Sequence, residues 1–183
     1  IDNAGTITLN RCRLNQNYAN AGSSSGGGLN NSGSATLNGC LVDYNKCTMQ
    51  GGGLENGYTA GNTNVLTATN STVVFNTQAY SVATVGGAGM CFRSGSGYLT
   101  NCTIAYNDNT LGGTASSAGL QCLDAAVRVY VKNSLISFNK ISGNYAYLVS
   151  GWSADAYPDY AANITDNGGN IFGKYYNIDR KST

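Results

Sequence analysis

The sequence predicts an all-β fold, a right-handed parallel β-helix (β-solenoid) of about five to six coils with three short parallel sheets and an internal Asn ladder. Three observations support this prediction: one short pattern recurs five times, apolar residues alternate within each copy, and an Asn closes each copy. The copies occupy residues 10–17, 38–45, 69–76, 100–107 and 132–139. A regular period of this length indicates stacked supersecondary units, because one unit alone cannot bury its apolar face.

The first strand of each unit lies just before the repeated pattern. Its inward positions are held by Leu9, Leu37, Ala68, Leu99 and Val131, and two residues earlier by Ile7, Ala35, Leu66, Gly97 and Val129. Side chains of a strand alternate between its two faces with a period of two. These positions have the opposite parity to those of the strand that follows. We therefore expect a corner near residues 10–11 and at each equivalent place.

The second strand begins at a position held by Cys or Ser. The residues at this position are Cys12, Cys40, Ser71, Cys102 and Ser134. An aliphatic residue follows two positions later in every copy. Gln or an aromatic residue follows four positions later, at Gln16, Tyr44, Phe75, Tyr106 and Phe138. This alternation predicts that all three positions share the face that is turned to the core.

An Asn follows directly after the aromatic position in every copy. The five residues are Asn17, Asn45, Asn76, Asn107 and Asn139. The amide of Asn carries both donors and an acceptor, so stacked copies can bond to one another along the axis. The recurrence therefore predicts a structural Asn ladder.

Glycine-rich segments precede a third strand. They lie at residues 26–29, 51–54, 86–90 and 118–120. Glycine tolerates a positive φ and a close approach of the backbone, so these segments suit tight corners. Three short strands per unit predict three parallel sheets, a rise of about 4.8 Å per coil and a rod roughly 24 Å long.

Length and composition narrow the class of protein. The chain has 183 residues, which suits a single domain over residues 1–183 or a piece of a longer solenoid. Charged residues make up 10% of the chain and the net charge is +1, so we expect no nucleic-acid binding. No run of 18 apolar residues occurs, so we expect no membrane insertion. The chain has no His, which excludes Ser-His-Asp and Cys-His catalysis within it, and we expect neither a cofactor nor a metal.

The six cysteines lack the C-x-x-C spacing of zinc sites. Adjacent coils place Cα atoms within disulfide reach, so Cys12–Cys40 and Cys91–Cys122 are the candidate disulfides. Cys102 lies two coils away from Cys40, which is too far for a bridge. Because Ser takes the same position in two copies, we expect free, stacked thiols that fill the core.

The end of the chain departs from the repeat. Residues 140–183 are predicted to form an irregular, Tyr-rich coil or cap. Its aromatic residues include Tyr145, Tyr147, Trp152, Tyr157 and Tyr160. They either cover the strand edges of the last coil or form a surface that contacts a ligand such as a carbohydrate.

The acidic residues are scattered. Eight Asp and one Glu occur without an Asp-Asp or Asp-x-Asp pair. We expect Asp43 to point outward, and we place Asp155 and Asp159 in a solvated loop around Pro158. Glycoside hydrolysis needs two carboxylates at a set separation, and the spacing indicates no such pair. No catalytic residue is assigned, and we expect a protein without enzymatic activity.

Residues 5–173 resemble the right-handed parallel β-helix repeat proteins of the pectate-lyase-like fold. The motifs that carry the resemblance are Gly-Gly-Gly-Leu and Leu-x-Asn-Cys-x-Val/Ile-x-Tyr-Asn, together with Asp-Asn-Gly-Gly-Asn-Ile-Phe-Gly at residues 166–173. They are similar to bacterial secreted, cell-surface and autotransporter-like proteins. The resemblance implies an extracellular or cell-surface location, but this fold carries lyases, polygalacturonases, adhesins and inactive passengers alike.

We expect a non-catalytic structural or adhesive module. Its expected partners are copies of itself, stacked through the coil ends into a fibre or oligomer, and extracellular polysaccharide. A polysaccharide lyase or glycoside hydrolase is the first alternative. An ice-binding protein is the second, because a small Thr array lies on one outward face: the pairs Thr6/Thr8 and Thr67/Thr69, with Thr36 between them. That array is interrupted by Tyr98 and Tyr130.

Overall fold

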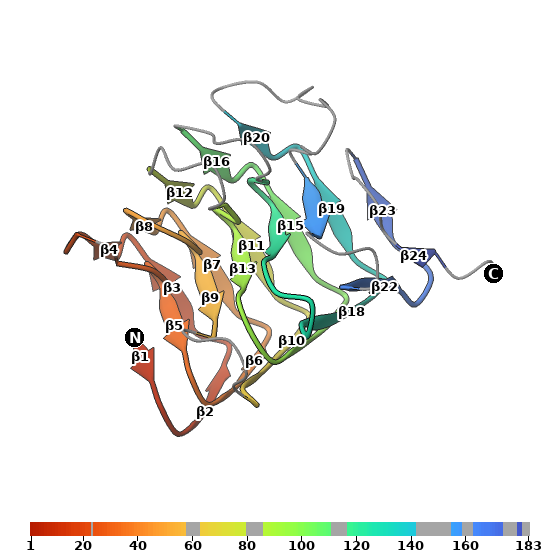
Figure 1. Ribbon diagram of the computed structural model, residues 1–183, viewed down its shortest axis with the longest axis horizontal. Helices are drawn as coiled ribbons and strands as arrows, with labels where there is room; N and C mark the ends of the chain where they lie inside the picture. The colour runs from red at the N-terminus through yellow and green to blue at the C-terminus, as the bar shows by residue number, and fades with distance from the viewer. Residues whose placement is uncertain are drawn as a thin grey trace.

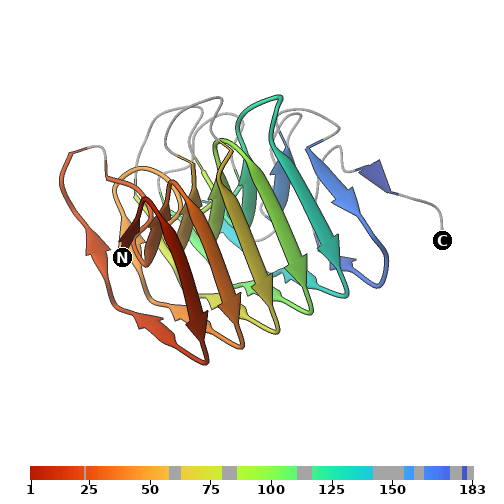
Figure 2. The same cartoon turned by 90° about the horizontal axis from the view of Figure 1, so that it is seen from below.

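The computed structural model has the predicted all-β architecture, with parallel strands stacked into a β-solenoid. It describes residues 1–22, 24–57, 63–79, 86–110, 117–141, 155–158, 163–173 and 179–180, and no helix occurs among them. Figures 1 and 2 show the turns lying side by side along one axis. The predicted number of coils is wrong: the solenoid makes about four turns, not five to six. Five copies of the repeat bound only four intervals, from Asn17 to Asn139.

Four parallel sheets run along the solenoid. Sheet A holds β1 (Asp2–Asn3), β5 (Leu29–Asn31), β9 (Leu54–Asn56), β13 (Met90–Phe92), β17 (Leu120–Cys122) and β21 (Ala156–Pro158). Sheet B holds β2 (Thr6–Asn10), β6 (Ser34–Asn38), β10 (Val65–Thr69), β14 (Ser96–Thr100), β18 (Arg128–Lys132), β22 (Ile164–Asp166) and β24 (Asp179–Arg180). Sheet C holds β3 (Arg13–Asn15), β7 (Leu41–Asp43), β11 (Thr72–Val74), β15 (Thr103–Ala105), β19 (Leu135–Ser137) and β23 (Ile171–Phe172). Sheet D holds β4 (Tyr18–Ala19), β8 (Lys46–Cys47), β12 (Thr77–Gln78), β16 (Asp108–Asn109) and β20 (Lys140–Ile141).

Each turn passes through sheets B, C, D and A in that order. The first turn therefore contains β2 to β5, and the second contains β6 to β9. Sheet D is the one that the sequence did not predict, where three sheets were expected. Its strands are two residues long, so they are too short to show an alternation of polar and apolar side chains.

Positive φ angles form the corners on either side of sheet C. The expected corner between sheets B and C is present, with φ of 51° at Arg11, 61° at Gly39 and 53° at Asn101. At the far end of sheet C, the residue at the Gln or aromatic position of every copy has a φ between 54° and 60°. This left-handed residue turns the side chain to the opposite face. The prediction that the aromatic position faces the core is therefore wrong.

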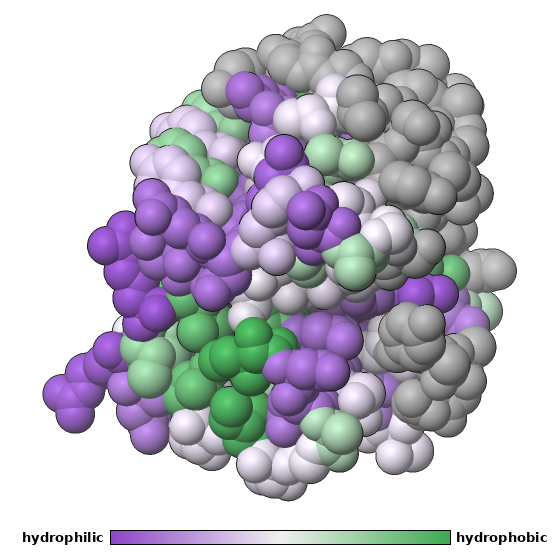
Figure 3. Space-filling model, turned by 90° about the vertical axis from the view of Figure 1, so that its left-hand side faces the viewer, coloured by the Kyte–Doolittle hydropathy of each residue, from purple (hydrophilic) through white to green (hydrophobic). Residues whose placement is uncertain are grey.

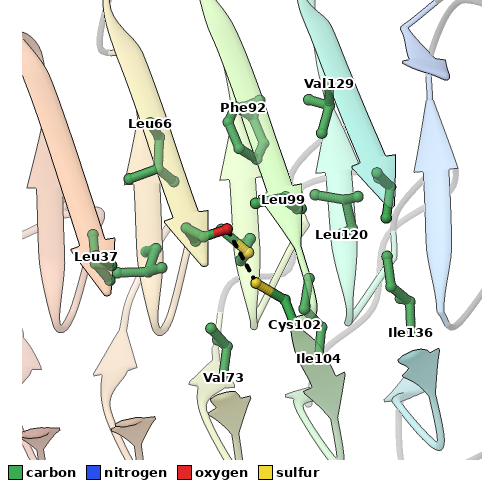
Figure 4. Packing of buried hydrophobic residues seen from close by; sticks show 14 of the residues in the cluster. Leu37, Leu66, Val73, Phe92, Leu99, Cys102, Ile104, Leu120, Val129 and Ile136 are labelled. Carbon is green, nitrogen blue, oxygen red and sulfur yellow. Dashed lines mark hydrogen bonds between the residues drawn. The ribbon is translucent and has the colours of Figure 1, made fainter. Parts of the chain in front are cut away.

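The lumen is filled by the aliphatic positions that the repeat predicts. Leu37, Leu66, Val73 and Ile104 are buried, as Figure 4 shows. Phe92 is the largest fully buried side chain among the described residues, and its ring lies against Gly97. A Cβ at Gly97 would lie 2.5 Å from the ring, so the glycine makes room for Phe92 where other turns carry Ile, Ala, Leu or Val.

Candidate functional site

The Asn ladder is buried and fully bonded over its middle rungs. The Nδ2 of Asn45 donates to the Oδ1 of Asn76 at 3.0 Å and to the backbone oxygen of Leu14 at 2.8 Å. The backbone N of Asn45 donates to the same Oδ1 at 2.9 Å. The same bonds recur at Asn76 and Asn107. Each middle amide thus uses both donors and its acceptor, so the ladder belongs to the framework of the fold.

Asp155 supplies the last acceptor of the ladder. Its Oδ1 accepts from the backbone N and from the Nδ2 of Asn139, both at 2.9 Å. Asp155 is 2% exposed. Its expected place in a solvated loop is therefore wrong, because the carboxylate replaces an amide oxygen at the end of the column. Asp159 lies outside the described residues.

The Cys/Ser column makes hydrogen bonds instead of disulfides. The Sγ of Cys102 donates to the backbone oxygen of Ala68 at 3.3 Å (Figure 4), and the Oγ of Ser134 accepts from the backbone N of Cys102 at 3.0 Å. All six cysteines are free. The candidate bridge between Cys91 and Cys122 does not form: Cys122 pairs in register with Phe92, so the two thiols point to opposite faces of sheet A. The candidate Cys12–Cys40 bridge is also absent, and each thiol donates to a backbone carbonyl.

A second Asn ladder, not predicted from the sequence, lies at the end of sheet A. Asn3 donates to Asn31, and Asn31 to Asn56, each over 2.7 Å. Phe92 and Cys122 take the same column in later turns. A signal is present in the sequence, because Gly-Leu-x-Asn occurs at residues 28–31 and 53–56. The two copies are only 25 residues apart, which is shorter than the main period.

An aromatic stripe runs along the outside of the corner between sheets C and D. We give this name to Tyr44, Phe75, Tyr106 and Phe138. Their ring centroids are 5.1, 5.5 and 5.4 Å apart, and the rings are stacked nearly parallel. The side chains are 43–54% exposed. Stacking covers the inner ring faces, so the stripe presents ring edges to solvent.

Two other carboxylates each pair with one basic side chain. Arg13 makes two hydrogen bonds to Asp43, which hold the pKa of that carboxyl below its ordinary value. Asp43 follows the lumen-facing Val42 on β7, so its side chain points outward as expected, and it is 3% exposed because Arg13 and Asn15 cover it. Lys140 lies 3.0 Å from Asp108 on sheet D. Among the described residues, no group of three or more Cys, Asp or Glu is arranged to hold a metal ion.

Glu55 lies in a separate buried space outside the lumen. On β9 it stands between two inward-facing residues, so its side chain projects from the outer face of sheet A. In register with it are Asn30, Cys91 and Gln121. The glycine corners fold over this face: a Cβ at Gly51 would lie 2.9 Å from the Cβ of Glu55. Glu55 is consequently 0% exposed.

The buried space around Glu55, which we call the Glu55 compartment, is lined mostly by hydrogen-bond acceptors. Four oxygens in it have no hydrogen-bond partner within the described structure. They are the Oγ of Ser25, the Oδ1 of Asn30 and both carboxylate oxygens of Glu55. The Nη1 of Arg93 lies 3.8 Å from the Oε1 of Glu55, beyond hydrogen-bond distance.

The titratable groups in the Glu55 compartment favour their neutral forms. Burial raises the pKa of Glu55 to about 7, although Ser25 and Arg93 act in the opposite direction. Burial and the nearby Glu55 raise the pKa of Cys47 to about 12, and the same two causes raise the pKa of Cys91. Glu55 is the one of these three whose charge changes near neutral pH.

A pocket of about 490 Å³ opens beside the first turn. Its lining includes Asn17, Tyr18, Ser25, Gly26 and Asn30. Ser25 and Asn30 therefore face the pocket on one side and carry two of the unbonded oxygens of the Glu55 compartment on the other.

The aromatic residues of the expected terminal surface are only partly described. Tyr145, Tyr147, Trp152 and Tyr160 lie outside the described residues. Tyr157 lies on β21, where its backbone pairs with Gln121. The described part of the chain contains no helix long and apolar enough to cross a bilayer.

Comparison with known proteins identifies no relative. No family model, no curated protein and no solved structure matches the chain. The fold and the contacts described above are therefore the grounds for a functional proposal.

Proposed function

We propose that the chain is a non-catalytic structural module of an extracellular or cell-surface protein. The observation that carries this proposal is the use of the recurrent polar side chains in stacking. The Asn ladder is bonded from turn to turn and ends on Asp155. The more specific likeness to right-handed, pectate-lyase-like and autotransporter-like proteins is part of the same proposal and rests on the sequence motifs.

Self-association through the first turn is the partner interaction we propose. Figure 3 shows this end of the molecule, where apolar side chains lie among polar ones. Ile7 and Leu9 pack against the core but are only partly buried, and Ile1 is 48% exposed. Covering such surface with a turn of a second copy would remove it from water and pair the outer edges of β1 to β4.

Light scattering of the purified chain tests this interaction. We expect oligomers or fibres at high concentration, and we expect Ile7→Lys to abolish them while circular dichroism stays unchanged. Thr8→Lys is the matched control, because Thr8 is exposed on the outer face of sheet B. Monomers at every concentration would contradict the proposal.

Contact with extracellular polysaccharide is a second role of the same module. The aromatic stripe supports it, since four exposed aromatic residues in a row supply apolar contact area. Affinity electrophoresis in gels that contain pectin or cellulose derivatives tests the contact. Retardation of the chain that is lost in Tyr106→Ala supports it, and unchanged mobility in all gels contradicts it. Release of unsaturated uronate products from the same polysaccharides would instead favour the lyase alternative.

Ice binding is kept as an alternative because of one feature of sheet B. Thr8, Thr36 and Thr67 are stacked in register on its outer face. The column continues into Tyr98 and Tyr130, whose rings stack 5.3 Å apart. A thermal-hysteresis measurement decides this alternative: a gap between melting and freezing points supports ice binding, and none excludes it.

A further inference from the structure

We propose that Glu55 is a proton-dependent latch, which holds the glycine corner of the first turn against the second turn when its carboxyl group is neutral. The corner in question is the segment Ser25 to Gly28. Its contact with the second turn is a set of three backbone hydrogen bonds, donated by Gly26, Gly27 and Gly28 over 2.9, 3.1 and 2.9 Å.

The hydrogen-bonding chemistry of the Glu55 compartment supports the neutral form. Asn30 Oδ1 is an acceptor that lacks a donor, and the ionised carboxylate adds two more acceptors. A protonated Glu55 supplies an O–H donor to this group. Ionisation of Glu55 places a charge in a fully buried space, and Ser25 and Arg93 offset only part of the cost of burying it, so the charged form is unfavourable unless water enters.

The other charged or titratable groups near Glu55 do not remove this cost. Arg93, which follows β13, is 3.8 Å away and its side chain is 30% exposed. Cys47 of β8 and Cys91 of β13 face the compartment as neutral thiols. Asp2 of β1 is exposed and accepts from the Nδ2 of Asn30 at 3.1 Å, so it adds a further negative charge on the solvent side.

The path by which water can reach Glu55 from the surface is short. Ser25, Gly26 and Asn30 separate the Glu55 compartment from the open pocket beside the first turn. Displacing the Ser25–Gly28 corner would therefore hydrate the carboxylate without disturbing the lumen, which lies on the other side of sheet A. As the pH rises, opening of this corner should become more favourable while the rest of the solenoid stays closed.

The same column contains a matched position for comparison. Gln121 occupies the register of Glu55 two turns later, and its Oε1 accepts a hydrogen bond from the backbone N of Ser117 at 2.6 Å. The corner of that turn is thus held by a neutral amide. An acid at position 121 should therefore depend less on pH than Glu55, because the N–H of Ser117 would stabilise its charged form.

Hydrogen exchange at single amides tests the latch, with protection factors corrected for the intrinsic pH dependence of exchange. We expect the protection of Gly26, Gly27 and Gly28 to fall by up to about 300-fold between pH 4.5 and pH 8, because the pKa of Glu55 is raised from its ordinary value of 4.5 to about 7. Glu55→Gln should keep these amides protected at every pH. Gln121→Glu should cause a smaller loss of protection at Gly87 and Gly89, whose amides donate to Ser117 and Ala118, because the N–H of Ser117 would stabilise its carboxylate.

The outcomes separate the latch from a general effect of pH. Equal pH dependence in the wild type and in Glu55→Gln would overturn the proposal, as would constant protection in the wild type. Loss of protection at the lumen amides of Val42 and Val73 together with the corner would also overturn it, because opening would then be global.

Discussion

The lumen and the Glu55 compartment both bury polar side chains completely, but they differ in how far the hydrogen-bonding groups of those side chains are satisfied. In the lumen, Asn45, Asn76 and Asn107 bond to one another and to the backbone with every donor and acceptor. Outside sheet A, Glu55 is equally buried and has no hydrogen bond. The contrast shows that stacking alone does not satisfy a polar column; the side chains in it must carry both donors and acceptors. The lumen should therefore determine whether the chain folds. The Glu55 compartment should determine how the stability of the fold depends on pH.

Breaking the ladder in its middle should have the largest effect. Asn76→Leu leaves the backbone N and the Nδ2 of Asn45 without their acceptor, and Val42 without a donor. Loss of these buried bonds should lower the free energy of unfolding by about 4 kcal/mol in urea titrations. Asn17→Ala is the control, since Asn17 is exposed at the first rung and should cost about 1 kcal/mol. Equal losses in the two variants would show that the ladder does not act through buried bonds.

Replacing Glu55 should have the next largest effect, and only above acidic pH. A carboxyl whose pKa is raised to about 7 binds its proton more tightly in the folded chain than in the unfolded chain. The stability that this proton contributes is complete below about pH 4.5 and is lost as the pH rises to about 7. Glu55→Gln should thus be more stable than the wild type by up to about 3 kcal/mol at pH 8, with little difference at pH 4. Chemical unfolding at both pH values measures this, and parallel behaviour would refute it.

Overfilling the lumen should have a smaller effect than either change. Gly97→Ala places a Cβ within 2.5 Å of the Phe92 ring, so the ring must move. We expect a loss of about 2 kcal/mol in thermal or urea unfolding. The double variant Gly97→Ala with Phe92→Leu should recover part of the loss, because the shorter side chain leaves room for the methyl group. A double variant with fully additive losses would contradict this packing explanation.

The aromatic stripe offers the smallest effect, because two opposing contributions meet there. Phe75 has a φ of 57°, which is unfavourable for a residue other than glycine, and it stacks on two neighbouring rings. Phe75→Ala keeps the strain and loses the stacking, at a cost of about 1–2 kcal/mol. Phe75→Gly loses both, and its unfolding free energy should stay within about 1 kcal/mol of the wild type. A glycine variant less stable than the alanine variant would show that strain at this corner is negligible.

Much of the lumen could be predicted from the sequence, because its residues recur in chemistry as well as in position. The Cys/Ser, aliphatic and Asn columns repeat in all five copies, and the period of two assigns the faces within each strand. The same reasoning assigned the aromatic position to the wrong face. In the sequence, the alternation continues through this position without a break. In the structure, the backbone has a positive φ at Tyr44 and its equivalents, which turns the aromatic side chain to the outer face.

The Glu55 compartment could not be predicted, because its column does not repeat chemically. Asn30, Glu55, Cys91 and Gln121 share a register and a face but no side-chain type. The burial of Glu55, Cys91 and Gln121 follows from the way the glycine corners fold back over sheet A, which is a property of the assembled turns. Sheet D was missed for a related reason, since two residues per strand leave no periodic pattern.

The uniform direction of the Asn ladder has an electrostatic consequence. Every rung donates toward the last turn and accepts from the side of the first, so the amide dipoles are aligned head to tail, as peptide dipoles are in an α-helix. Their positive end meets the carboxylate of Asp155, which accepts both terminal hydrogen bonds. A β-solenoid of this kind thus carries an axial macrodipole made of side chains, and a single acidic residue neutralises its positive pole.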